Sequence, residues 1–87
     1  MLVSSQPTEM PTVLRVQGYR LFFYAGDGIE PPHVHVESGD GEAKVWLQSV
    51  SVANTVGYSQ REAQRILRLV EEHQTELLKA WYDFFTS

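Results

Sequence analysis

Apolar and polar positions alternate through the first half of the chain, which is the pattern of β-strands. Residues 12–25, TVLRVQGYRLFFYA, are rich in β-branched and aromatic side chains and have Gln17-Gly18 at a bend. This segment predicts a β-hairpin in which Val16 pairs with Tyr19. The following GDGIEPP predicts a loop, because glycine and two prolines interrupt the hydrogen bonding of a sheet.

A second hairpin is predicted for the segment HVHVESGDGEAKVWLQ. A two-residue turn at Asp40-Gly41 places Glu37 opposite Lys44, which is an attractive cross-strand pair. A turn at Gly39-Asp40 places Glu37 opposite Glu42 instead, and the two like charges disfavour that register. We therefore expect the turn at Asp40-Gly41.

Both registers divide the side chains of this hairpin between the same two faces. The buried face is expected to carry the aliphatic side chains Val34, Val36, Ala43, Val45 and Leu47. If the two hairpins join in phase, the opposite face carries Arg15, Arg20, Tyr24, His33, His35, Glu37, Lys44 and Trp46. Antiparallel sheets commonly leave one face in water, so we expect this second face to be open.

The second half of the chain follows a helical period. SQRE, which starts at Ser59, is the pattern of a capping box in which Glu62 reaches back to the first residue. Apolar residues then recur at helical spacing to about Phe85, with a gap near His73 and Gln74. Such a helix is about 39 Å long, more than a small sheet needs, so we expect its end to bend or to project toward a partner. The preceding SVSVANTVG is either a short strand or an irregular connection.

These elements predict an α+β fold, a small antiparallel sheet of two β-hairpins with one long C-terminal helix packed on one face. We place a single domain at residues 10–87, after a flexible N-terminal tail at residues 1–9, and Met10 is an alternative start. No segment has the character of a signal peptide or a membrane span, and no cysteine is present. We therefore expect no membrane association and a cytoplasmic location.

The histidines of EPPHVHVE, His33 and His35, are the main candidates for chemistry. One hypothesis is metal-independent RNA cleavage, in which both histidines transfer protons because the pKa of histidine lies near neutrality. The same face would supply Lys44 and Arg15 for catalysis at the phosphate and Arg20, Tyr24 and Trp46 for RNA binding. The net charge of −4 opposes general nucleic-acid binding, although a local basic patch is compatible with it.

Metal binding is a second hypothesis. Residues i and i+2 on one strand project in parallel, so two imidazoles can converge on one ion, and Glu37 is the next side chain in the row. Zinc normally takes three or four ligands, so His33, His35 and Glu37 are the alternative metal site and zinc the alternative cofactor. A third interpretation is that the two rings only cover Trp46 and its aromatic neighbours.

From Met10 to about Phe85 the chain resembles a family of small bacterial proteins of unknown function, marked by MPTVLR and EPPHVHVE. AKVWL and the closing GYSQREAQRILRLVEEHQTELLKAWYDFF are also similar to that family. The resemblance implies a toxin–antitoxin-like gene pair, in which a second small protein is encoded beside this one. Residues 1–9 fall outside the resemblance.

A cognate small protein from the neighbouring gene is therefore the expected partner, and a homodimer is a further option. Four aromatic side chains at the helix end, Trp81, Tyr82, Phe84 and Phe85, exceed what one helix stripe buries. Trp81, Tyr82 and Phe85 are therefore candidate partner contacts, although aromatic side chains are usually core. We expect a member of such a pair that cleaves or binds RNA, a ribonuclease if it is an enzyme. The alternative is a non-enzymatic protein-binding module with a histidine-ligated metal.

Overall fold

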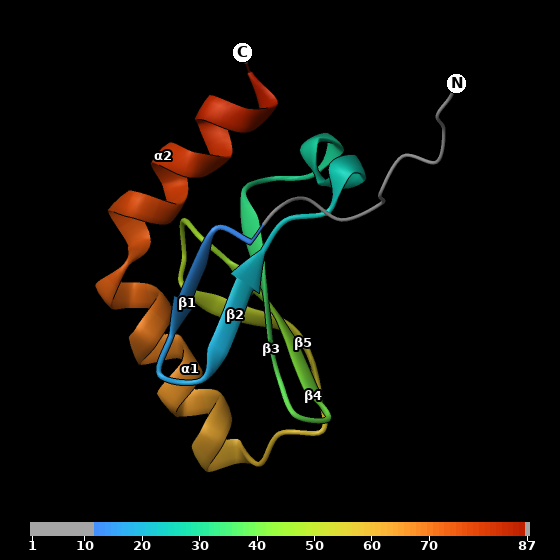
Figure 1. Cartoon of the computed structure of the whole chain (residues 1–87), viewed down its shortest axis with the longest axis vertical. Helices are drawn as coiled ribbons and strands as arrows, with labels where there is room; N and C mark the ends of the chain where they lie inside the picture. The colour runs from blue at the N-terminus through green and yellow to red at the C-terminus, as the bar shows by residue number, and fades with distance from the viewer. Residues whose placement is uncertain (1–11, 87) are drawn as a thin grey trace.

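The computed structural model describes residues 12–86, which form an antiparallel sheet and two helices in two layers (Figure 1). The elements in chain order are β1 (Leu14–Val16), β2 (Tyr19–Phe22), the 3-10 helix η1 (Ala25–Ile29), β3 (His33–Ser38), β4 (Gly41–Trp46), β5 (Ser51–Val56), α1 (Gln60–Glu72) and α2 (Gln74–Phe85). The strands neighbour one another in chain order. The α+β class is confirmed, with β5 added to the two hairpins and two helices in place of one. The predicted tail at residues 1–9 lies outside the described residues.

The first hairpin has the predicted register, with Val16 opposite Tyr19. Gln17-Gly18 adopts positive φ at both residues, 54° and 84°, as a type I′ turn requires. Across β2 and β3, Arg20 pairs with Glu37, so the two hairpins join in phase. Their charged and aromatic side chains therefore share one face of the sheet.

The second hairpin has a different register from the predicted one. β3 and β4 turn at Gly39-Asp40, so Glu37 lies opposite Glu42. Arg20 on β2 binds the Glu37 carboxylate at 2.8 Å, which offsets the repulsion between the two glutamates. The predicted register is based only on the pairs between β3 and β4, so it leaves out the charge of Arg20, which lies on β2.

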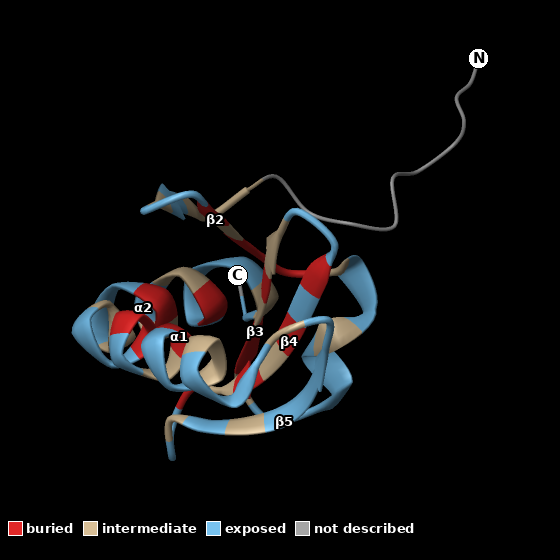
Figure 2. Ribbon diagram, turned by 90° about the horizontal axis from the view of Figure 1, so that it is seen from below, coloured by how far each residue is buried: buried red, intermediate tan, exposed pale blue. Residues whose placement is uncertain are grey.

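The aliphatic face of the sheet packs against the helices, as predicted. Figure 2 shows the buried parts of the helices and strands turned toward each other. The fully buried side chains that meet there are Leu21, Val34, Val36, Val45 and Leu47 from the sheet side and Ile66, Val70 and Leu77 from the helices. Burying a side chain of this size stabilises a fold by about 1.5–3 kcal/mol, so this layer holds the helices in place.

The helical half of the chain bends at His73. Ser59 caps α1 as predicted, and its side chain accepts a hydrogen bond from the backbone N–H of Glu62 at 3.1 Å. The other half of the predicted capping box is not formed, because the Glu62 carboxylate accepts from the Tyr19 hydroxyl instead. His73 leaves helical geometry (φ −110°, ψ 15°) in the predicted apolar gap. The side-chain amide of Gln74 then donates to the carbonyl oxygen of Leu47 at 2.7 Å, which ties the bend to the sheet. Beyond it, α2 runs to the end of the molecule where η1 lies (Figure 1).

Candidate metal centre

His33 begins β3, and its ring is closed off from solvent. The residue is 0% exposed, so the expectation of an open, wet face is wrong at this position. The rings of Trp46, Trp81 and His35 surround it, with centroids 5.5, 5.1 and 5.1 Å away. Trp81 belongs to α2, the helix that follows the bend at His73, and it covers His33 at the start of β3. His35, the next side chain on the same face, stays partly exposed.

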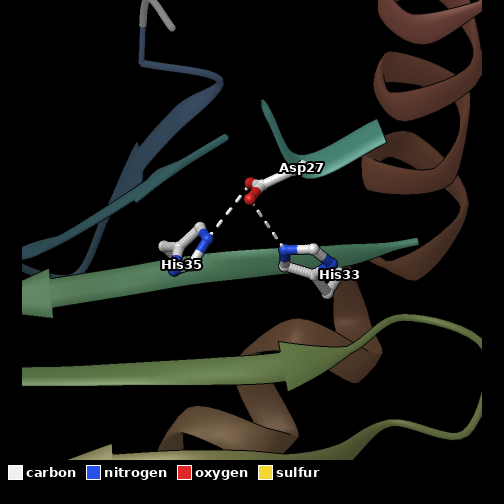
Figure 3. A group of neighbouring side chains, drawn as sticks. All are labelled: Asp27, His33 and His35. Carbon is white, nitrogen blue, oxygen red and sulfur yellow. Dashed lines mark hydrogen bonds and ion pairs between the residues drawn. The ribbon is translucent and has the colours of Figure 1, made fainter. Parts of the chain in front are cut away.

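The short helix η1 brings a carboxylate over the two histidines. Oδ2 of Asp27 accepts a hydrogen bond from the backbone N–H of Tyr24 at 2.8 Å, which fixes the side chain at the start of η1. Its Oδ1 lies 3.1 Å from Nε2 of His33, and its Oδ2 lies 3.1 Å from Nε2 of His35 (Figure 3). One ligand atom from each of the three side chains lies within 4.8 Å of the other two.

The hydrogen bonds of His33 determine which of its ring nitrogens carries the proton. Its Nδ1 lies 2.9 Å from the carbonyl oxygen of Pro31, which can only accept, so Nδ1 carries the proton. Nε2 of the neutral ring then carries a lone pair. Although Nε2 is at ion-pair distance from Oδ1 of Asp27, it is buried and makes no hydrogen bond within the described residues. Two lone pairs that face each other repel, unless a cation lies between them.

Nε2 of His35 is hydrogen-bonded to Oδ2 of Asp27 at 3.1 Å, and because the carboxylate can only accept, Nε2 carries the proton that a metal ion would replace. Burial lowers the pKa of His35 below its usual value, and the opposing attraction of the Asp27 carboxylate does not cancel this shift. The neutral imidazole is the form that binds metals. The ring stacks on Phe22 at 5.5 Å and meets Tyr24 edge-on at 4.6 Å, so its orientation is held by packing.

The other residues predicted for catalysis or metal binding are engaged elsewhere. Glu37, the predicted third metal ligand, forms an ion pair with Arg20 at 2.8 Å and does not join the cluster. Lys44 on β4 binds the Glu30 carboxylate at 2.6 Å and lowers the pKa of that carboxyl. Arg15 is exposed on the edge strand β1. The structure therefore brings the two histidines together and leaves Arg15 apart.

The side chains predicted to bind RNA contact one another or their neighbours. The guanidinium of Arg20 lies 4.3 Å from the ring centre of Phe22, and the ammonium of Lys44 lies 4.8 Å from the ring centre of Trp46. Tyr24 packs against the edge of the histidine cluster. The polar and aromatic side chains of this face therefore contact one another more than the sequence pattern indicates.

The aromatic residues predicted to bind a partner differ in exposure. Trp81 is only 4% exposed and packs against Phe23 and Phe85 at 5.3 and 4.3 Å between ring centroids, so it belongs to the core. Phe85 is partly buried. Tyr82 and Phe84 are 44% and 47% exposed, and they are the aromatic side chains that α2 presents outward.

Sequence reasoning misses Asp27, because GDGIEPP has the composition of a loop whose glycines and prolines serve backbone geometry. The available signal is an acidic residue six positions before His33, in the pattern D-x5-H-x-H. That pattern does not reveal that η1 folds back over β3.

The fold and this cluster define a small α+β domain with a largely buried histidine–carboxylate centre. The chain belongs to the family described as a domain of unknown function, DUF4160, which matches residues 18–82 and so includes the cluster. Searches of curated proteins and of solved structures gave no match. Within residues 12–86, neither α1 nor α2 has the length and apolar character needed to cross a bilayer.

Proposed function

We propose that the chain is a metal-binding domain in which Asp27, His33 and His35 ligate one divalent transition-metal ion, with zinc as the expected metal. The observation that carries the proposal is the buried Nε2 of His33, which faces a carboxylate oxygen at 3.1 Å without a hydrogen bond. Imidazole and carboxylate are ordinary zinc ligands. Ligand atoms about 2.0–2.2 Å from a tetrahedral zinc ion lie about 3.3 Å apart. The two 3.1 Å separations run to different oxygens of Asp27. One ligand atom from each of the three side chains lies within 4.8 Å of the other two, so the three side chains would close around the ion as it binds.

The surroundings of His33 also support a metal. A histidine ligand usually donates its other ring N–H to a carbonyl or carboxylate, and Nδ1 of His33 donates to the Pro31 carbonyl. A second proton on His33, placed on Nε2, would also relieve the repulsion between this nitrogen and Oδ1 of Asp27. It would, however, place an imidazolium in a fully buried position beside a second imidazole, whereas a metal ion satisfies all three side chains.

The proposed metal joins η1 to β3 and thereby supports the end of α2. A Cβ atom added at Gly28 would lie 2.7 Å from the Phe85 ring, so η1 is also in close contact with α2. The exposed apolar side chains of these two segments are Ile29, Tyr82 and Phe84. We therefore propose a metal-stabilised protein-binding module, with these side chains as candidate contacts to the cognate small protein of a toxin–antitoxin-like pair.

Metal-independent RNA cleavage has less support from the geometry. His33 is closed to solvent, so its ring does not reach a bound RNA to exchange a proton. Lys44 and Arg20 are each paired with a carboxylate, which weakens their attraction for phosphate. The ribonuclease hypothesis stays a prediction.

Zinc titration of the metal-free protein tests the proposed site. We expect one ion per chain and a higher Tm, because a ligand that binds only the folded state stabilises it. Asp27→Asn removes a charged ligand and should weaken zinc binding by more than about tenfold. Glu37→Gln is the matched control, since it removes one carboxylate from the same face of the sheet, and it should bind zinc like the wild type. Equal melting curves with zinc and with chelator, or loss of binding only in Glu37→Gln, would contradict the proposal.

A further inference from the structure

The outward side of α1 carries three arginines in one row. Arg61, Arg65 and Arg68 are all exposed, and their spacing of four and three residues places them on the same side of the helix. With a rise of about 1.5 Å per residue, the row is about 10 Å long. It lies away from Ile66, Leu69 and Val70, which face the sheet.

Like Arg15, these arginines make no ion pair within the described residues, in contrast to Arg20 and the two lysines. Within residues 12–86, Arg20 pairs with a glutamate, as does Lys44, and Lys79 pairs with Asp83. No such pair involves a residue of the α1 row in this part of the chain. Their charge is therefore available to a ligand.

The same side of α1 lacks acidic side chains over its first turns. The exposed neighbours of Arg61 and Arg65 are Gln60 and Gln64. Glu62 is partly buried, and its carboxylate accepts a hydrogen bond from the Tyr19 hydroxyl at 2.9 Å. Exposed acidic residues of α1 begin at Glu71 and Glu72, which adjoin the C-terminal end of the row three and four residues after Arg68. An acidic protein thus presents a local positive surface, to which the helix N-terminus adds.

We propose that the row of Arg61, Arg65 and Arg68 on α1 binds the phosphate backbone of a nucleic acid. The guanidinium group matches phosphate oxygens bidentately, and glutamine amides commonly add contacts to backbone or bases. A protein partner would need an apolar anchor, and the exposed large apolar side chains among the described residues are Ile29, Val56, Tyr82 and Phe84, none of them on α1. The proposed surface is independent of the metal centre.

Three phosphate contacts define the strength expected of this surface. Each contact contributes about −0.7 to −0.9 to the slope of log Kobs against log salt concentration, so the slope should be about −2 to −3. Affinity should then fall about 20- to 40-fold between 50 and 200 mM salt. The net charge of −4 further weakens binding, so we expect dissociation constants in the range typical of non-specific complexes.

Fluorescence anisotropy with a short labelled single-stranded RNA and with a DNA duplex of the same sequence tests the proposal. The triple variant Arg61→Gln, Arg65→Gln and Arg68→Gln should lose more than about tenfold in affinity at low salt, and Arg68→Gln alone should reduce the salt slope by about one. The control for Arg68→Gln is Lys79→Gln, which removes one exposed charge from α2 and should bind within about twofold of the wild type.

Equal affinity for the two probes supports recognition of the backbone alone, and a preference identifies the class of nucleic acid bound. A triple variant that binds as tightly as the wild type overturns the proposal. So does a wild type that shows no salt dependence, or one that binds an acidic polypeptide and neither nucleic acid. The single variant Arg68→Gln keeps the test decisive if the triple variant does not fold.

Discussion

Asp27 is the residue that gives the two histidines of β3 a common target. It belongs to η1, and the backbone N–H of Tyr24 holds its carboxylate in place. Because Pro31 fixes the proton of His33 on Nδ1, the carboxylate faces a lone pair instead of a donor. The contact between His33 and Asp27 is repulsive by itself and would become attractive around a cation, whereas Nε2 of His35 is hydrogen-bonded to the same carboxylate.

The buried His35 makes a prediction about pH. Since burial lowers the pKa of His35 in the folded protein, the unfolded chain takes up a proton first as the pH falls. The stability that neutral His35 contributes is therefore fully present above about pH 6.5 and is lost as the pH falls through the lower folded pKa. Urea unfolding at a series of pH values, with chelator present, should show this loss. His35→Asn should reduce the slope of the free energy of unfolding against pH by up to about 1.4 kcal/mol per pH unit.

A histidine outside the cluster provides the comparison for that experiment. His73 lies at the bend between α1 and α2, and its Nδ1 is 3.0 Å from the Glu76 carboxylate. His73→Asn should leave the part of the pH dependence that belongs to His35 in place. An unchanged decline in His35→Asn would contradict the assignment of that decline to His35.

At the scale of elements, α2 combines a core side with an outward side. The ring of Trp81 is buried against Phe23 and Phe85, whereas Tyr82 is largely exposed. Trp81→Ala should therefore lower the free energy of unfolding by about 3–5 kcal/mol, and Tyr82→Ala should change it by less than about 1 kcal/mol. Urea denaturation of the two variants measures both values. A Trp81→Ala protein of wild-type stability would show that Trp81 is not core.

Elements whose determinants are local in sequence are the ones that the sequence predicts. The Gln17-Gly18 turn, the alternation of faces and the Ser59 cap each depend on a few neighbouring residues. The register of the second hairpin depends on Arg20 from a third strand, so a two-strand comparison fails. The prediction of the site residues from the sequence is incomplete for the same reason. Asp27 lies near the two histidines only because η1 folds back over β3.

At the scale of the molecule, the two proposed surfaces belong to different elements. The proposed metal site, Asp27 with His33 and His35, lies between η1 and β3 and beside Trp81 of α2. Figure 1 shows η1 and the C-terminal half of α2 at the same end of the molecule. The arginine row lies on α1, on the other side of the bend at His73. The net charge of −4 conceals this division, because it averages a positive helix face with acidic side chains elsewhere.

The proposed site requires one metal ion to bind Nε2 of both His33 and His35. Nitrogen-15 NMR of the histidine side chains tests it most directly, because the chain has three histidines and His73 serves as an internal control. One equivalent of zinc should shift Nε2 of His33 and His35, leave the proton on Nδ1 of His33, and leave His73 unchanged. Zinc that shifts only His73, or none of the three rings, would contradict the account.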